Sequence, residues 1–221
     1  MSVHLEREMA FLRKNILEEA AMVEQAIDRA IRAVRDRDAA LGAEVVDGDR
    51  EIDEAEIRVE EECLKILALY NPVASDLRFI VTVLKMNNDL ERMGDLAVSM
   101  ARRAQFLSKN EVPYPLPGDF DIMSQSVREM VRKALDALIN GDDELAMKVC
   151  QHDDQVDQLK RKMGNEIRNM MERDPQNMRG LLKMLDLTRH MERIADLATN
   201  ISEDVVYLVR GEIIRHSVKD V

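Results

Sequence analysis

Apolar and polar positions alternate along most of the chain with the period of amphipathic helices. Five prolines interrupt this pattern, and none of them needs to lie inside a helix, where proline removes a backbone donor and clashes with the preceding turn. The turns Asn71-Pro72 and Asp174-Pro175 would each fold two helices into a hairpin, and the proline-rich segment 112–118 would act as a linker. We therefore expect an all-α fold with helices over Leu5–Asp36, Ala39–Tyr70, Ala74–Lys109, Phe120–Asn140, Asp142–Arg173 and Gln176–Arg210.

The second half of the chain repeats the first. Residues 38–45 (DAALGAEV) correspond to residues 142–149 (DDELAMKV), and the same spacing places residues 49–53 on residues 153–157. Turns, charges and apolar positions agree along this correspondence, which is typical of a structural repeat. We therefore expect two tandem three-helix bundles related by an internal repeat, the first over residues 1–111 and the second over residues 119–216.

A pair of acids recurs in both halves on this apolar pattern. Glu91 and Asp95 return as Glu192 and Asp196, each pair being spaced so that both acids share one helix face. Both pairs continue a stripe that is spaced alternately by three and four residues, which predicts a surface that faces the core. The two stripes are Leu77, Val81, Leu84, Asn88, Glu91, Asp95 and Val98, and Met178, Leu182, Leu185, Arg189, Glu192, Asp196 and Thr199.

A second pair of acids precedes the turn of each hairpin. Asp49 and Asp53 lie about as far before the first turn as Glu91 lies after it, and Asp153 and Asp157 hold the equivalent place in the second half. Because antiparallel helices rise equally per residue, the two pairs of each hairpin should face each other. The sequence thus predicts a group of four carboxylates in each half.

Four carboxylates drawn together need a positive counterion, because close like charges raise one another's pKa. A hard cation such as Mg, Ca, Mn or iron suits carboxylate oxygens, and Gly94 would let a neighbouring backbone or a ligand come close. Ion pairs to Arg78, Arg92 or Arg193 would also neutralise the acids, and a lone acid pair on a helix usually faces solvent. From the residues alone, metal binding and ion pairing both stay open.

Composition limits the classes of function. The 221 residues are 46% apolar and carry a formal net charge of −11, which argues against nucleic-acid binding, because nucleic acid attracts a basic surface. We find no signal-peptide core and no run of about 20 apolar residues, and Cys63 and Cys150 fit buried thiols in a reducing compartment, so we expect a cytoplasmic protein. Nucleotide-binding and zinc-protease motifs are missing, so we do not expect an enzyme.

The chain resembles the PhoU family of phosphate-signalling regulators over nearly its whole length. The resemblance rests on the segments 4–8 (HLERE), 71–80 (NPVASDLRFI), 89–97 (DLERMGDLA), 191–201 (MERIADLATNI), 206–211 (VYLVRG) and 215–216 (RH). It implies two three-helix bundles and repression of phosphate import and of the phosphate-starvation response when phosphate is plentiful. It also implies two partners, the ATPase subunit of a Pst-type phosphate ABC transporter and a PhoR-type sensor histidine kinase, met at the inner membrane face, and we expect a homodimer.

The same resemblance implies that the paired acids bind divalent or trivalent metal ions of iron, Zn, Mg or Mn. The implied ligands are Asp49, Asp53, Glu91, Asp95, Asp153, Asp157, Glu192 and Asp196, with Asn88 and Asn200 as further candidates.

The second half departs from the family pattern. Arg189 stands at the position of Asn88 and Ala195 at that of Gly94, so the second site is expected to hold fewer ions or to bind through Arg189 instead. In the first half, Ser99 stands where the family favours Asn, whereas Asn200 keeps the Asn in the second half. A metal-handling or enzymatic bundle and a purely structural scaffold are the alternatives to a regulatory adaptor.

Overall fold

The computed structural model describes residues 3–109 and 115–214, and these residues are almost entirely helical, with no strand among them. The expected all-α class is confirmed, and each predicted helix boundary lies within two residues of the observed one. The predicted linker residues 112–114 and the outer ends of the predicted bundles lie outside the described residues. The helices are α1 (Val3–Asp36), α2 (Ala39–Tyr70), α3 (Ser75–Lys109), α4 (Phe120–Asn140), α5 (Asp143–Arg173) and α6 (Met178–Arg210), with a 3-10 turn over Pro175–Asn177.

Equivalent capping residues begin the second helix of each half. The side chain of Asp38 accepts hydrogen bonds from the backbone N–H groups of Ala40 and Leu41 at 2.9 and 3.0 Å. Asp142 accepts one from the N–H of Leu145 at 2.9 Å. An aspartate at this position satisfies donors that the first turn of a helix leaves unpaired. The repeat seen in the sequence is thus repeated in the local structure.

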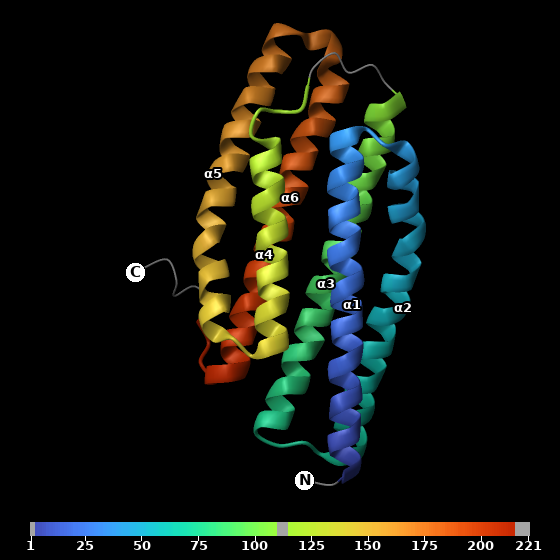
Figure 1. Cartoon of the computed structure of the whole chain (residues 1–221), viewed down its shortest axis with the longest axis vertical. Coiled ribbons are helices and arrows are strands. Elements are labelled where there is room, and N and C mark those ends of the chain that lie inside the picture. The colour runs from blue at the N-terminus through green and yellow to red at the C-terminus, as the bar shows by residue number, and fades with distance from the viewer. Residues whose placement is uncertain (1–2, 110–114, 215–221) are drawn as a thin grey trace.

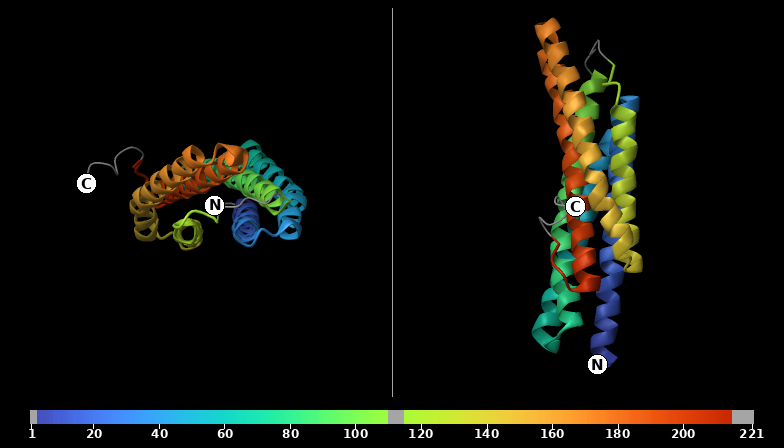
Figure 2. Two further views of the ribbon diagram at one scale, coloured as in Figure 1. Left: turned by 90° about the horizontal axis from the view of Figure 1, so that it is seen from above. Right: turned by 90° about the vertical axis from the view of Figure 1, so that its left-hand side faces the viewer.

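The hairpins α2/α3 and α5/α6 form one curved layer, and α1 and α4 lie on its concave side (Figure 2). Helices α3 and α6 lie side by side at the centre and run in opposite directions, so the second half is inverted relative to the first (Figure 1). Two ion pairs join these central helices, Lys85 to Asp204 at 3.6 Å and Arg103 to Asp186 at 3.4 Å. Lys85 and Asp186 are equivalent in the repeat, as are Arg103 and Asp204, so an approximate two-fold axis relates the halves.

The stripes that contain the acid pairs do not face the core, and this prediction is wrong. Leu77 and Val81 are 41% and 37% exposed, and their counterparts Met178 and Leu182 are 38% and 48% exposed. The reason is that α3 packs against α1 and α2 on one side and against α6 on the other, so most of its circumference is apolar. Several sets of positions on this helix therefore show the helical period, and the period alone does not identify the set that faces the core. Of the predicted stripe on α3 only Val98 is buried, and the buried apolar residues of this helix also include Phe79, Ile80, Val83, Met86, Leu90, Met93 and Met100.

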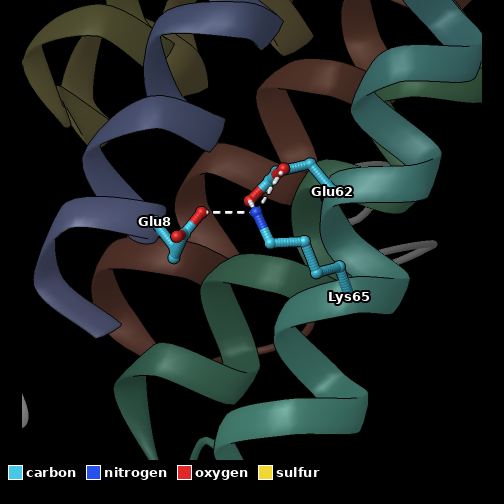
Figure 3. A network of polar contacts seen from close by, with 3 residues as sticks. All are labelled: Glu8, Glu62 and Lys65. Atoms are coloured by element: carbon cyan, nitrogen blue, oxygen red, sulfur yellow. Dashed lines mark hydrogen bonds and ion pairs between the residues drawn. The ribbon is translucent and has the colours of Figure 1, made fainter. Parts of the chain in front are cut away.

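A polar network ties α1 to α2 near one end of the molecule (Figure 3). Lys65 Nζ donates hydrogen bonds to Glu8 Oε2 at 2.6 Å and to the two carboxylate oxygens of Glu62 at 2.9 and 3.1 Å. The hydrogen bond from Lys65 lowers the pKa of Glu8. Since Glu62 is nearly buried, the lysine supplies the charge that this carboxylate needs inside the helix pair.

Cys63 and Cys150 are both buried and unbridged, as predicted. Burial raises the pKa of each thiol to about 12, so neither is a nucleophile at neutral pH. Within the described ranges, no helix has an apolar stretch long enough to cross a membrane.

Candidate metal centres

The four acids of the first half face each other across the α2/α3 hairpin, as the spacing predicts. Burial, followed by the negative charges of Asp53 and Asp95, raises the pKa of Asp49. Burial also raises the pKa of Glu91, and the charges of Asp95, Glu56, Asp53 and Asp49 raise it further. These mutual effects join side chains of both helices, so the carboxylates form one electrostatic group.

Among the described residues, no ion pair neutralises the first acidic cluster, defined as Asp49, Asp53, Glu91 and Asp95, although the positive charge of Arg102 partly offsets the rise in the pKa of Asp49. Over residues 3–109 and 115–214, none of these four side chains makes an ion pair or a hydrogen bond. The nearby Arg92 pairs instead with Asp89 at 3.6 Å, and Arg50 with Glu54 at 2.9 Å. The predicted alternative of ion pairing to Arg92 therefore does not hold for this cluster in the structure.

The side chains are not drawn into a ready-made coordination shell. In the part of the chain that the structure describes, no three His, Cys, Asp or Glu groups stand in a metal-holding arrangement. The donor set nevertheless fits a hard cation in kind, because all four groups are carboxylates that raise one another's pKa, and Arg102 offsets this effect only in part at Asp49.

Gly94 lies beside this cluster, but a side chain rather than a backbone approaches it. A Cβ atom on Gly94 would lie 3.4 Å from Cγ2 of Ile52 and 3.9 Å from Oδ1 of Asp49, which is ordinary van der Waals contact. The glycine therefore widens the space next to Asp49 slightly without being required there.

The acids of the second half also form one electrostatic group. Burial raises the pKa of Asp196 to about 6, with further contributions from the charges of Glu192, Asp153 and Asp157. Burial and the charge of Asp157 raise the pKa of Asp153 as well. We call these four residues the second acidic cluster. The predicted meeting of α5 and α6 acids is confirmed.

Basic residues of the chain neutralise part of this second acidic cluster. Lys160 Nζ donates a hydrogen bond to Glu192 Oε1 at 2.5 Å, and Arg161 donates one to Asp157 Oδ2 at 3.0 Å. Thr199 donates a weaker hydrogen bond to Asp153 at 3.4 Å. Positive charge thus reaches the second cluster from the same helix that carries two of its acids.

A cavity of about 350 Å³ lies beside the second acidic cluster. Its wall includes Leu197, and its polar lining comprises Arg92, Asp153, Arg193, Asp196, Thr199 and Asn200. Asn200, a candidate ligand, therefore lies with Asp153 and Asp196, whereas the other candidate, Asn88, is exposed on α3. The cavity brings together residues from both halves of the chain.

Three residues near the clusters were not predicted from the sequence. Glu56 follows Asp49 and Asp53 on the same face of α2, and this continued spacing could have revealed it. Lys160 and Arg161 were missed because long basic side chains on an acidic helix carry no pattern that identifies their partner.

Known proteins match this chain along nearly its whole length. A family model described as "PhoU domain" matches residues 16–104 and 120–205, one stretch in each half. A phosphate-specific transport system accessory protein PhoU homolog of Pseudomonas putida is 37% identical over 98% of this chain and 84% of the relative. A homolog with the same description from Aquifex aeolicus is 38% identical over 95% of both chains.

Solved structures agree with this match. The crystal structure of PhoU from Pseudomonas aeruginosa superposes with a TM-score of 0.91 at 36% identity, covering 94% of this chain and 99% of that one. The phosphate transport system regulatory protein PhoU from Streptococcus pneumoniae superposes with a TM-score of 0.86 at 26% identity, covering 95% and 98%. Sequence, repeat and fold thus agree, and the chain belongs to the PhoU family.

Proposed function

We propose that this protein regulates phosphate homeostasis and represses phosphate import and the phosphate-starvation response when phosphate is plentiful. The observation that carries the proposal is the family match in both halves together with relatives named as accessory proteins of the phosphate-specific transport system. The ATPase subunit of a Pst-type importer and a PhoR-type sensor histidine kinase are the proposed partners, met at the cytoplasmic face of the membrane. The protein would act by binding and not by catalysis, and as a homodimer.

The proposal includes metal binding at the acidic clusters. Divalent or trivalent ions such as iron, Zn, Mg or Mn would be held by Asp49 and Asp53 on α2 together with Glu91 and Asp95 on α3. The mutual repulsion of these carboxylates, which the charge of Arg102 offsets only in part at Asp49, supports this, because close like charges strain the hairpin unless a cation offsets them. When bound, the ion supplies a positive charge that links two helices, and it would draw the side chains closer together.

The regulatory proposal is tested in a deletion strain of the source organism. We expect phosphate-starvation reporters such as alkaline phosphatase to be active in rich phosphate without the protein and silent again when the wild-type gene is restored. A strain complemented with Glu91→Gln/Asp95→Asn tests whether the first acidic cluster is needed. Unchanged reporter activity in the deletion strain would contradict the regulatory role.

A metal-handling bundle is the second candidate, and the mutual repulsion within the first acidic cluster favours it specifically. This candidate predicts that deletion changes cellular metal content or metal tolerance while phosphate-dependent expression stays normal. Elemental analysis of the two strains beside the same reporter assay therefore separates the two functions.

A further inference from the structure

The cavity beside the second acidic cluster contains two arginines that are equivalent in the repeat. Arg92 follows Glu91 on α3, and Arg193 follows Glu192 on α6. Both line the same cavity, although they belong to different halves of the chain. The reason is the antiparallel packing of α3 against α6, which brings equivalent positions near the approximate two-fold axis together (Figure 1).

The guanidinium groups retain donors for a ligand. Arg92 is 46% exposed, and its ion pair with Asp89, at 3.6 Å, is longer than a hydrogen bond. Arg193 is exposed and makes neither an ion pair nor a hydrogen bond to any residue in the described ranges. Asn200 adds an amide donor to the cavity lining, whereas the hydroxyl of Thr199 already donates to Asp153. Two forked guanidinium groups beside a neutral donor are suited to a small oxyanion.

The same cavity is also lined by carboxylates, so an anion would be repelled from it unless a cation covers them. Asp153 and Asp196 both line the cavity and belong to the second acidic cluster. A hard cation on their oxygens would reverse the sign of their local charge, and a metal ion is often the largest local charge in a site. At about 350 Å³ the cavity lies at the lower end of ligand pockets, which suits an ion with ordered water better than a nucleotide.

We propose that this cavity binds inorganic phosphate between a cation held by Asp153 and Asp196 and the guanidinium groups of Arg92 and Arg193. This inference rests on the metal binding included in the proposed function. Because Arg92 comes from the first half and the other three residues from the second, the bound anion would connect the two bundles. Phosphate would thereby stiffen the packing of α3 against α6 and act on the regulator directly.

The test is calorimetric titration of inorganic phosphate into two samples of the full chain. One sample is loaded with Mn²⁺, and the other is stripped of metal with a chelator. We expect saturable binding in the loaded form, weakened about tenfold or more by Arg193→Gln and by Arg92→Gln, and none in the stripped form. The matched control is Arg189→Gln, an exposed arginine on the same helix that does not line the cavity, and it should leave phosphate affinity unchanged. In thermal melts, phosphate should raise the Tm of the Mn²⁺-loaded wild type and of the loaded Arg189→Gln control, raise that of the two loaded cavity variants less, and leave that of the stripped protein unchanged.

The other outcomes overturn the inference in distinguishable ways. Mn²⁺ that binds without any phosphate binding contradicts the phosphate site alone and leaves the metal centres standing. A chain that binds no Mn²⁺ contradicts both the metal centres and the cation-dependent site. Phosphate that binds equally well after both arginine changes, or no better than chloride does, shows non-specific attraction and also rejects the site. The deletion strain tests the regulatory role independently of all three results.

Discussion

The first acidic cluster makes no ion pair within the described ranges and has only the charge of Arg102 near Asp49, whereas the second is already partly neutralised by ion pairs to Lys160 and Arg161. The two clusters occupy equivalent places in the repeat, so the difference lies in the basic side chains around them and not in the fold. Charged groups that are paired need a metal less than charged groups that are not. The comparison teaches that equal ligand spacing does not imply equal affinity, and we expect the first cluster to bind metal more tightly.

A second difference between the halves lies inside the bundles. Glu19 on α1 is completely buried, and in the described residues neither of its carboxylate oxygens has a hydrogen-bond partner. Its equivalent in the repeat is Met123 on α4, which is just as buried and apolar. At this position the first bundle thus carries a buried carboxyl group where the second has an apolar side chain, at a cost in free energy of unfolding.

The largest expected effect comes from removing the charges of the first acidic cluster. Glu91→Gln combined with Asp95→Asn should weaken metal binding by more than the roughly 10–100-fold loss typical of an altered outer-shell partner, because these side chains are the proposed ligands. Helicity should hardly change, since neither side chain is buried in the core. Elemental analysis beside circular dichroism checks both statements.

The matched change in the second half sharpens this comparison. Glu192→Gln combined with Asp196→Asn should remove less bound metal than the first pair does. An equal or greater loss would mean that the lysine and arginine of the second cluster do not compete with the ion, and the proposed difference between the halves would be wrong.

The next effect concerns Glu19 and pH. The pKa of Glu19 is raised to about 8, mainly by burial and next by the negative charge of Glu56 on α2. The positive charge of Arg58 on α2 lowers this pKa, and the negative charge of Glu91 on α3 raises it. The folded state therefore keeps this proton up to about pH 8, whereas the unfolded chain loses it near the ordinary glutamate value. Between these limits each rise in pH lowers the free energy of unfolding, by a few kcal/mol in total.

Replacing Glu19 tests this reading of the first bundle. Glu19→Met introduces the residue that the second half has at Met123, and it should remove the part of the pH dependence that Glu19 causes. The variant should therefore exceed the wild type in free energy of unfolding by most above pH 8. Chemical denaturation at pH 5, 7 and 9 measures it, with Glu18→Met, an exposed neighbour, as the control. Parallel pH curves for the wild type and Glu19→Met would show that Glu19 titrates normally in the folded protein.

A smaller effect is expected from the second cluster's own cation. Lys160→Met removes the ion pair with Glu192 while keeping a long apolar stem, so the metal no longer competes with an ammonium group. We expect metal affinity at the second cluster to rise about tenfold, which corresponds to about 1.4 kcal/mol. Titration of Mn²⁺ into a chain that also carries Glu91→Gln/Asp95→Asn isolates this site, and a fall in affinity would show that Lys160 supports the site instead of competing for it.

How much of this could be predicted differs between the fold and the site. The apolar period and the prolines predicted where the helices lie, and the equal rise of two antiparallel helices predicted that Asp49 and Glu91 meet, because these rules are local or nearly local. The buried face of α3 could not be identified from the sequence, because its packing against α6 as well as α1 and α2 makes most of that helix apolar. The meeting of Arg92 and Arg193 depends on the inverted docking of the halves, which no local pattern encodes.

The smallest expected effect comes from Gly94→Ala, which gives the first half the residue that the second half has at Ala195. The added Cβ would lie 3.4 Å from Ile52, which is ordinary contact, so the helix should gain roughly 0.5–1 kcal/mol from the better helix former. Metal affinity at the first acidic cluster should stay within about threefold, because a Cβ 3.9 Å from Asp49 Oδ1 does not block that oxygen. Thermal melts with and without Mn²⁺ measure both quantities. If Gly94→Ala instead lowers metal affinity to the level of the second cluster, the missing side chain at Gly94 sets the two halves apart, and not the lack of ion pairs to lysine and arginine at the first cluster.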